Sequence, residues 1–204
     1  KALLRALQPE RVRWFTETDI SVAEDEELLG LLRESGCQQV LIGLESPGPR
    51  GLDGLERRRN WKLAQLPSYE AAIARIQAHG ITVNGCFILG LDGDTPEVFD
   101  RIYAFVERTG LYDVQITVQT PFPGTPLYAR LKAEGRLLED GRWDLCTLFD
   151  VNVRPTHMSS DELQQGLLDL ARRLYEEHFI AARRRRFWAQ QRSARRPAWA
   201  AMER

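Results

Sequence analysis

The chain has 204 residues, of which 43% are hydrophobic and 28% charged, and its formal net charge is −1. This balance excludes a disordered or fibrous protein, and no apolar run reaches the roughly 20 residues of a membrane-spanning helix. The charge is uneven, because the segment from Arg172 onward holds ten Arg and three Glu. With neither a transmembrane segment nor a signal peptide in this sequence, we expect a cytoplasmic protein.

The three cysteines, Cys37, Cys86 and Cys146, are too far apart for a known ligand motif. Their spacing matches neither a zinc pair nor a ferredoxin run, and an odd number does not make a disulfide framework. We expect free thiols and no metal ligand among them. Because the chain starts at Lys1 and almost at once enters a strand-like segment, we also expect it to be a piece of a longer protein.

Runs of β-branched and aromatic residues alternate with amphipathic helical patterns through the first two thirds of the chain. This alternation predicts four βα units, whose right-handed crossovers give a parallel sheet that curls toward a barrel. The predicted fold class is α/β: a partial (βα) TIM-type barrel, truncated at its N-terminus, with a C-terminal helical extension. Strands are expected over residues 12–18, 39–44, 81–89 and 113–120, with helices over 24–35, 68–79 and 96–109 between them.

Polar residues lie where the predicted strands end. Asp19, Glu45, Asp92 and Gln119 fall at or near the four carboxyl ends. Because the carboxyl ends of parallel strands share one rim, we expect these side chains to converge on a binding site. Taken alone, the glycine-rich turn that holds Asp92 and Asp94 is explained equally well by a binding site and by a plain βα connection. For both aspartates, roles in the turn and in helix capping are favoured over catalysis.

The connections and the C-terminal half are less regular. Residues 48–66 form a long polar connection, which is either a binding loop or an insertion. A further helix is expected over residues 126–134, and residues 143–153 form either an edge strand or an irregular cover. Ser159 and Glu162 make a capping box ahead of a helix with one leucine-rich face. The expected divisions are βα units (1–135), a cover and helix (136–182) and a basic tail (183–204).

The basic tail has two interpretations. Arginines interleaved with Phe187 and Trp188 suit contacts with phosphates and bases, which would make the segment an RNA-binding surface. A frayed basic helix or terminal extension is the favoured interpretation. Nucleic acid is therefore not expected as a partner.

Four motifs give the chain a resemblance to the later part of the radical S-adenosylmethionine barrel, in the cobalamin-binding branch that includes hopanoid methylases. They occur in the same order as in that family, on successive predicted strand exits, and the resemblance covers about residues 10–180. The motifs are TETDIS at 16–21, GLES at 43–46, GCFILGLDGDT at 85–95 and TPFPGTPLY at 120–128.

The resemblance implies a partial barrel of about six βα units, of which the first two would precede Lys1. It places upstream of this chain the C-x-x-x-C-x-x-C loop that ligates a 4Fe-4S cluster, and a cobalamin domain. The implied enzyme cleaves S-adenosylmethionine to a 5′-deoxyadenosyl radical and methylates or otherwise alters an unreactive carbon of a small-molecule or lipid substrate, with methylation favoured. Without the upstream part of the same protein, the fragment is expected to be inactive.

The resemblance also implies which residues contact S-adenosylmethionine. Glu45 and Ser46 take the place of the polar residues that contact the ribose or the amino-acid end. The strand backbone at Ile88 and Gly90 is implied to contact the adenine, which can approach closely because Gly90 has no side chain. Gln119 and Pro121 are implied to complete the wall of the cofactor site at the last strand. Catalytic residues stay unassigned. Glu45 as a salt bridge on the barrel rim is the competing interpretation.

Other functions stay open at this point. One is a cofactor-independent α/β-barrel lyase or hydrolase, in which Glu45 and Asp92 act as acid and base. Others are a radical S-adenosylmethionine enzyme that modifies RNA, and a non-catalytic RNA-binding module that uses the arginines. A cysteine triplet in the upstream sequence would distinguish the radical enzyme from the lyase or hydrolase.

Overall fold

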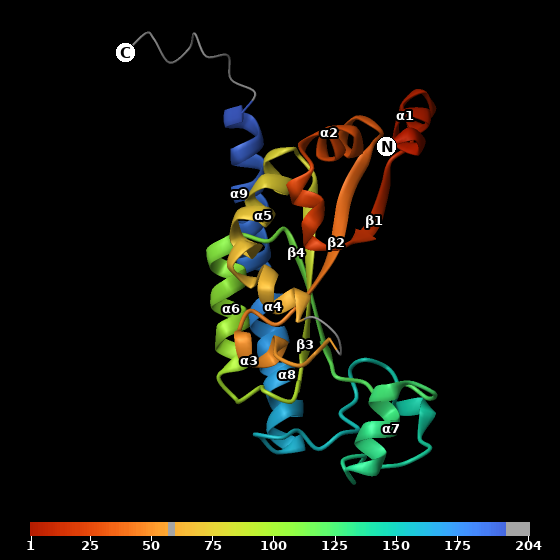
Figure 1. Ribbon diagram of the computed structural model, residues 1–204. Helices are drawn as coiled ribbons and strands as arrows, with labels where there is room; N and C mark the ends of the chain where they lie inside the picture. Colours follow the sequence, from red (N-terminus) through yellow and green to blue (C-terminus); the bar gives the residue numbers. More distant parts are fainter. Residues whose placement is uncertain (57–59, 195–204) are drawn as a thin grey trace.

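The computed structural model describes residues 1–56 and 60–194, and its centre is one parallel sheet with the strand order β1-β2-β3-β4 (Figure 1). Each predicted strand is present, and the bounds differ from the prediction by two residues or fewer at every end. The strands are β1 (Trp14–Thr18), β2 (Cys37–Glu45), β3 (Thr82–Leu89) and β4 (Asp113–Val118).

Helices connect consecutive strands, so every neighbouring pair is parallel, as a series of βα units requires. After β1 the chain forms η2 (Ile20–Glu24) and α2 (Glu26–Glu34). The connection at 48–66 contains α3 (Pro49–Leu52) and α4 (Trp61–Gln65), and it is followed by η3 (Leu66–Ser68) and α5 (Tyr69–Ala78). Helix α6 (Val98–Thr109) joins β3 to β4, and α1 (Ala2–Leu7) and η1 (Gln8–Glu10) precede β1.

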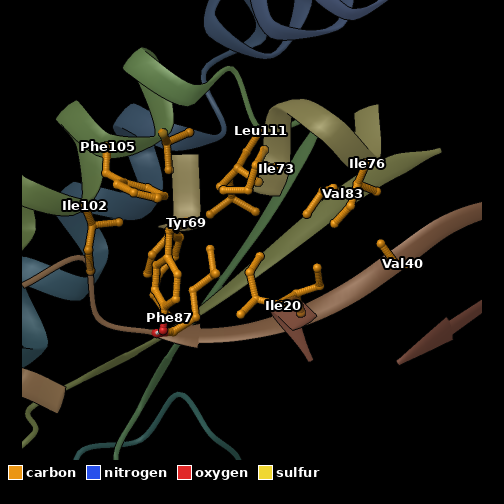
Figure 2. Close-up of a cluster of buried hydrophobic side chains, with 14 of the residues drawn as sticks. Ile20, Val40, Tyr69, Ile73, Ile76, Val83, Phe87, Ile102, Phe105 and Leu111 are labelled. Carbon is orange, nitrogen blue, oxygen red and sulfur yellow. Dashed lines mark hydrogen bonds between the residues drawn. The ribbon is translucent and has the colours of Figure 1, made fainter. Parts of the chain in front are cut away.

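The two faces of the sheet differ because successive side chains of a strand point to opposite sides. One face is fully buried against α5 and α6, and Figure 2 shows Val40, Val83 and Phe87 from the strands within this core. The opposite face carries side chains such as Phe15, which is 70% exposed, and the partly exposed Leu41 and Asn84. This second face is the inner face of the partial barrel.

Helix α8 (Ser160–Leu174) begins with the predicted capping box. The Ser159 hydroxyl accepts a hydrogen bond from the Glu162 N–H at 3.1 Å, and the Glu162 carboxylate accepts one from the Ser159 N–H at 2.7 Å. The predicted leucine face is buried and packs α8 beside α6. Gly166 is needed at this contact, because an added Cβ would lie 2.1 Å from the Phe99 ring. The buried leucines are Leu163, Leu167, Leu170 and Leu174.

The predicted boundary of the basic tail at residue 183 falls inside helix α9 (Glu177–Ala194). Arg183 is 4% exposed and donates hydrogen bonds to the carbonyl oxygens of Leu111 (3.2 Å) and Leu174 (3.0 Å). Phe187 is also buried, so this part of the segment is packed against the body rather than frayed or extended. Residues 195–204, the rest of the predicted tail, lie outside the described residues.

Residues 121–153 form a lobe at the carboxyl-end side of the sheet, where α7 stands apart from α5, α6, α8 and α9 (Figure 1). The lobe contains α7 (Pro126–Ala133) and η4 (Trp143–Leu145). An isolated antiparallel bridge joins Leu137 to Val153, so residues 143–153 are an irregular cover rather than an edge strand. None of the helices that the structure describes combines the length and the apolar composition needed to cross a membrane.

Candidate functional site

The carboxyl ends of the four strands form one rim, but the polar side chains predicted there have different surroundings. Asp19 accepts a hydrogen bond from the Ser21 N–H at 2.9 Å and caps η2, so its role is structural. Glu45 points onto the inner face, Asp92 contacts the α7 lobe, and Gln119 is buried between the lobe and the sheet.

Glu45 ends β2 in a strained conformation. Its φ of 63° is in the left-handed region, and the register between β2 and β3 shifts between Gly43 and Glu45, as at a β-bulge. A residue other than glycine in this region costs about 1–3 kcal/mol, and such strained residues are common at functional sites. The carboxylate lies over Gly43, where an added Cβ would be 2.5 Å from Glu45 Oε1. The bulge thus holds a carboxylate against the inner face.

Lys62 of α4 pairs with this carboxylate. Its Nζ lies 2.9 Å from Glu45 Oε1 and donates a hydrogen bond to the Gly43 carbonyl oxygen at 2.5 Å. The two side chains keep 20% and 17% of their surface exposed, so a ligand on the inner face can reach both. The salt bridge considered as the competing interpretation of Glu45 is therefore present. Lys62 lies in a connection without a periodic pattern, so the sequence carries no signal for this ion pair.

Ser46 and Asp94 join the loops that follow β2 and β3. Both are buried, and an added Cβ at Gly51 would lie 2.6 Å from Ser46 Oγ and 2.8 Å from Asp94 Oδ1. Asp94 Oδ2 accepts a hydrogen bond from the Leu91 N–H at 3.0 Å, which is the predicted turn role. Its predicted cap role is not seen, because the N-cap of α6 is Glu97. Burial raises the pKa of Asp94 to about 6.

Asp92 anchors the α7 lobe to the barrel rim. It accepts hydrogen bonds from Arg130 Nη1 at 2.6 Å and from Arg136 Nη1 at 2.7 Å. Partial burial alone would raise the pKa of Asp92, but the two arginines hold it below its ordinary value. A carboxylate held ionised between two guanidinium groups is poorly suited to donate a proton, so the geometry favours the structural role over the acid–base role.

The glycine at position 90 is required by the turn and by the packing of α8. Its φ is 81°, and an added Cβ would lie 2.7 Å from Leu163 Cδ2 of α8. The missing side chain therefore admits α8 as well as forming the turn. Ile88 lies on the partly exposed inner face of β3, and Pro121 is buried at the start of the lobe. The contacts predicted between these three residues and a cofactor stay predictions.

Gln119 follows β4 and is 7% exposed. Its N–H donates to the Leu89 carbonyl oxygen at 2.8 Å, which extends the pairing of β3 and β4. Its side-chain oxygen is buried without a hydrogen-bond partner among the described residues.

The cysteines do not converge. Burial raises the pKa of Cys37 and Cys86 to about 11, so both are protonated thiols near neutral pH. Among residues 1–56 and 60–194, no three His, Cys, Asp or Glu side chains are grouped so that they could hold a metal ion. Cluster ligands upstream of the chain stay a prediction.

The architecture and the rim define a class: a partial parallel α/β barrel with polar side chains where the strands end. The family model described as a domain of unknown function, DUF4070, matches residues 125–203. The bacteriochlorophyllide d C-12(1)-methyltransferase of Chlorobaculum tepidum is 28% identical over 181 residues, which are 89% of this chain and 38% of that protein. The hopanoid C-2 methylase of Rhodopseudomonas palustris is 34% identical over 124 residues, 61% of this chain and 23% of that protein.

A solved structure shares the fold. The radical S-adenosylmethionine methyltransferase TsrM from Kitasatospora setae, solved with cobalamin and a [4Fe-4S] cluster, matches 93% of this chain and 40% of its own with a TM-score of 0.54 and 18% identity. This match confirms the predicted partial barrel. The relatives, which include a hopanoid methylase, confirm the resemblance drawn from the four motifs, and the chain spans less than two fifths of the length of either.

Proposed function

We propose that this chain is the C-terminal part of a radical S-adenosylmethionine enzyme that methylates an unreactive carbon of a small-molecule or lipid substrate with the help of cobalamin. The observation that carries the proposal is the placement of the four family-like motifs. They fall on the exits of β1, β2, β3 and β4, which share one rim of one parallel sheet. Relatives named as a methyltransferase and a methylase are similar to 89% and 61% of this chain.

In this proposal the chain binds S-adenosylmethionine on the inner face and along the rim where the strands end, through Glu45, Ser46, Ile88, Gly90, Gln119 and Pro121. The fit is supported by the accessible carboxylate of Glu45, which offers acceptors to hydroxyl or ammonium groups. The cluster and the cobalamin, held by upstream parts of the same protein, supply the radical and methyl-transfer chemistry when bound.

The role of this chain is to orient the cofactor and to close the rim. Lys62 fixes the Glu45 carboxylate over Gly43, and Asp92 fastens the α7 lobe through Arg130 and Arg136. A lobe held beside the strand exits covers the place where the substrate has to meet the cofactor, and such cover excludes water. A cytoplasmic location belongs to the proposal and is supported by three free cysteines.

The test uses the intact protein, this chain with its upstream part, loaded anaerobically with iron and sulfide. Added S-adenosylmethionine and a strong one-electron reductant should yield 5′-deoxyadenosine. A protein that carries a full cluster, binds S-adenosylmethionine and still forms no 5′-deoxyadenosine would show that the radical assignment is wrong.

A further inference from the structure

A cavity of about 470 Å³ lies at the amino-terminal end of the sheet. Its lining includes Phe15, Gln39 and Thr82, which are register partners on β1, β2 and β3 and therefore point to the same inner face. Helix α9 forms another wall, and the last turns of this helix lie at the opposite end of the molecule from the α7 lobe (Figure 1). None of the six residues assigned to S-adenosylmethionine lines this cavity, so it is separate from the proposed cofactor site.

Exposed aromatic side chains line this cavity. Trp188 of α9 keeps 51% of its surface exposed, and Phe15 of β1 keeps 70%. The ring of the buried Phe187 packs edge-to-face against both Trp188 and Tyr112, with centroid distances of 5.1 Å and 5.2 Å. This packing supports the Trp188 indole, which can therefore offer an aromatic surface to a planar ring. Of the two aromatic residues that the sequence marks among the arginines, only Trp188 is accessible to a ligand.

The charged residues that line the cavity are the arginines Arg13 and Arg33, and no Asp or Glu of the described residues is among them. The Arg33 side chain lies over Gly80, where an added Cβ would be 3.4 Å from Arg33 Nε. Arg33 is half-buried, and its guanidinium forms no ion pair with the residues that the structure describes. The neighbouring carboxylate of Asp113 pairs instead with Arg184 at 3.1 Å. The cavity thus has a positive charge that the described carboxylates do not neutralise.

The size, the aromatic walls and the charge together define the ligand that fits. A volume of about 470 Å³ lies within the range of about 300–1,000 Å³ that is typical of sites for small organic molecules. Exposed aromatic walls favour a planar ring, which gains from stacking or edge-to-face contact. A guanidinium group without an anionic partner favours a carboxylate, which it can bind through two parallel N–H groups.

We propose that this cavity is a second ligand site, which binds a planar aromatic anion through contact with the Trp188 ring and charge-assisted hydrogen bonds from Arg33. The site does not depend on the proposed function, because it lies at the end of the sheet away from the rim and shares no residue with the cofactor site. The ligand and S-adenosylmethionine can therefore be bound at the same time.

The test compares two probes that differ in charge. 2-Naphthoate and naphthalene-2-carboxamide have the same two rings, and each is titrated by calorimetry into the intact protein, which is this chain with its upstream part. We expect 2-naphthoate to bind roughly tenfold more tightly, since only the carboxylate forms a charge-assisted contact with Arg33. Arg33→Met should abolish this preference. Arg185→Met, which removes an exposed arginine of α9 outside the cavity, should retain it.

A second pair of variants tests the aromatic contact. Trp188→Ala should weaken the binding of both probes roughly tenfold, because the ring contact is lost whatever the charge of the probe. Trp143→Ala removes an indole of similar exposure, 48%, from the α7 lobe and should weaken neither. Both indoles are about half exposed, so we expect the two variants to fold, and their melting temperatures check this expectation.

Several results would overturn the inference. Equal affinities of the two probes for the wild type, or an unchanged preference in Arg33→Met, would show that Arg33 does not bind the anion. Failure of the intact protein to bind 2-naphthoate would mean that the upstream part closes the cavity. Displacement of 2-naphthoate by S-adenosylmethionine would assign the probe to the cofactor site, and displacement by a single-stranded oligouridylate would make the cavity part of a nucleic-acid surface.

Discussion

Asp94 should make the stability of the protein depend on pH in the direction opposite to ordinary acid denaturation. Its carboxyl is buried where the loops after β2 and β3 meet, and burial raises its pKa from 3.8 to about 6. The backbone N–H of Leu91 and the charge of Arg101 lower this pKa, and the charge of Asp92 raises it, but burial is the largest effect. The folded protein thus binds the Asp94 proton more tightly than the unfolded chain.

The sign and size follow from this difference. Above pH 6 the folded state holds a buried, charged carboxylate, and the free energy of unfolding is at its lowest. As the pH falls through 6 toward 3.8, the folded state takes up the proton first and gains stability. Between about pH 7.5 and about pH 4.5 the contribution of Asp94 is about 2 kcal/mol.

The assay is urea unfolding of the wild-type chain and of Asp94→Asn at a series of pH values. Other carboxylates of the protein act in both, so the difference between the two proteins isolates Asp94. We expect the stability of the wild type, relative to the variant, to rise by about 2 kcal/mol as the pH falls over this range. A difference that stays constant with pH, or that changes in the opposite direction, would refute the reasoning.

Two further predictions concern the scaffold. Gly90→Ala should lower the free energy of unfolding by about 1–3 kcal/mol, because the alanine would combine a left-handed φ with a Cβ only 2.7 Å from Leu163. The control Gly124→Ala, at a φ of 77° with no atom within 4 Å of the added Cβ, should show only the smaller effect of backbone strain. Equal losses of stability in urea unfolding would contradict the packing role of Gly90 against α8. Arg183→Met should lower the free energy of unfolding by about 1–3 kcal/mol, because it leaves the carbonyl oxygens of Leu111 and Leu174 unpaired. The control Arg185→Met, at an exposed position, should change the stability little. Similar melting temperatures for the two variants would show that the buried arginine does not anchor α9.

The sheet and the C-terminal cap could be predicted because their signals are local. The alternation of β-branched and polar residues fixes β3 and β4 within the chain, and Ser159 with Glu162 defines the start of α8 from four consecutive positions. These patterns depend on neighbours in sequence, so they are readable before the fold is known.

The features that the sequence does not predict depend on contacts between segments that are distant in the chain. Lys62 meets Glu45 only because α4 returns across the end of β2, and residues 48–66 have no periodicity that indicates such a path. The left-handed φ of Glu45 has no sequence signal either, since glycine is the residue expected there. A run of four arginines reads as solvated, yet the packing of α9 against Leu111 and Leu174 buries Arg183.

The affinity of the intact, cluster-loaded protein for S-adenosylmethionine, compared between Glu45→Gln and Glu107→Gln, tests the central claim most directly. Both variants remove one carboxylate charge, but Glu45 lies at the bulge beside Lys62, whereas Glu107 is exposed on α6, which covers the opposite face of the sheet. We predict that Glu45→Gln binds S-adenosylmethionine roughly ten- to a hundredfold more weakly, because a charge-assisted contact is lost, with little change in melting temperature. Glu107→Gln should bind normally. Normal binding by Glu45→Gln together with a much lower melting temperature would show that Glu45 is a structural residue of the rim and would contradict the assignment of the site.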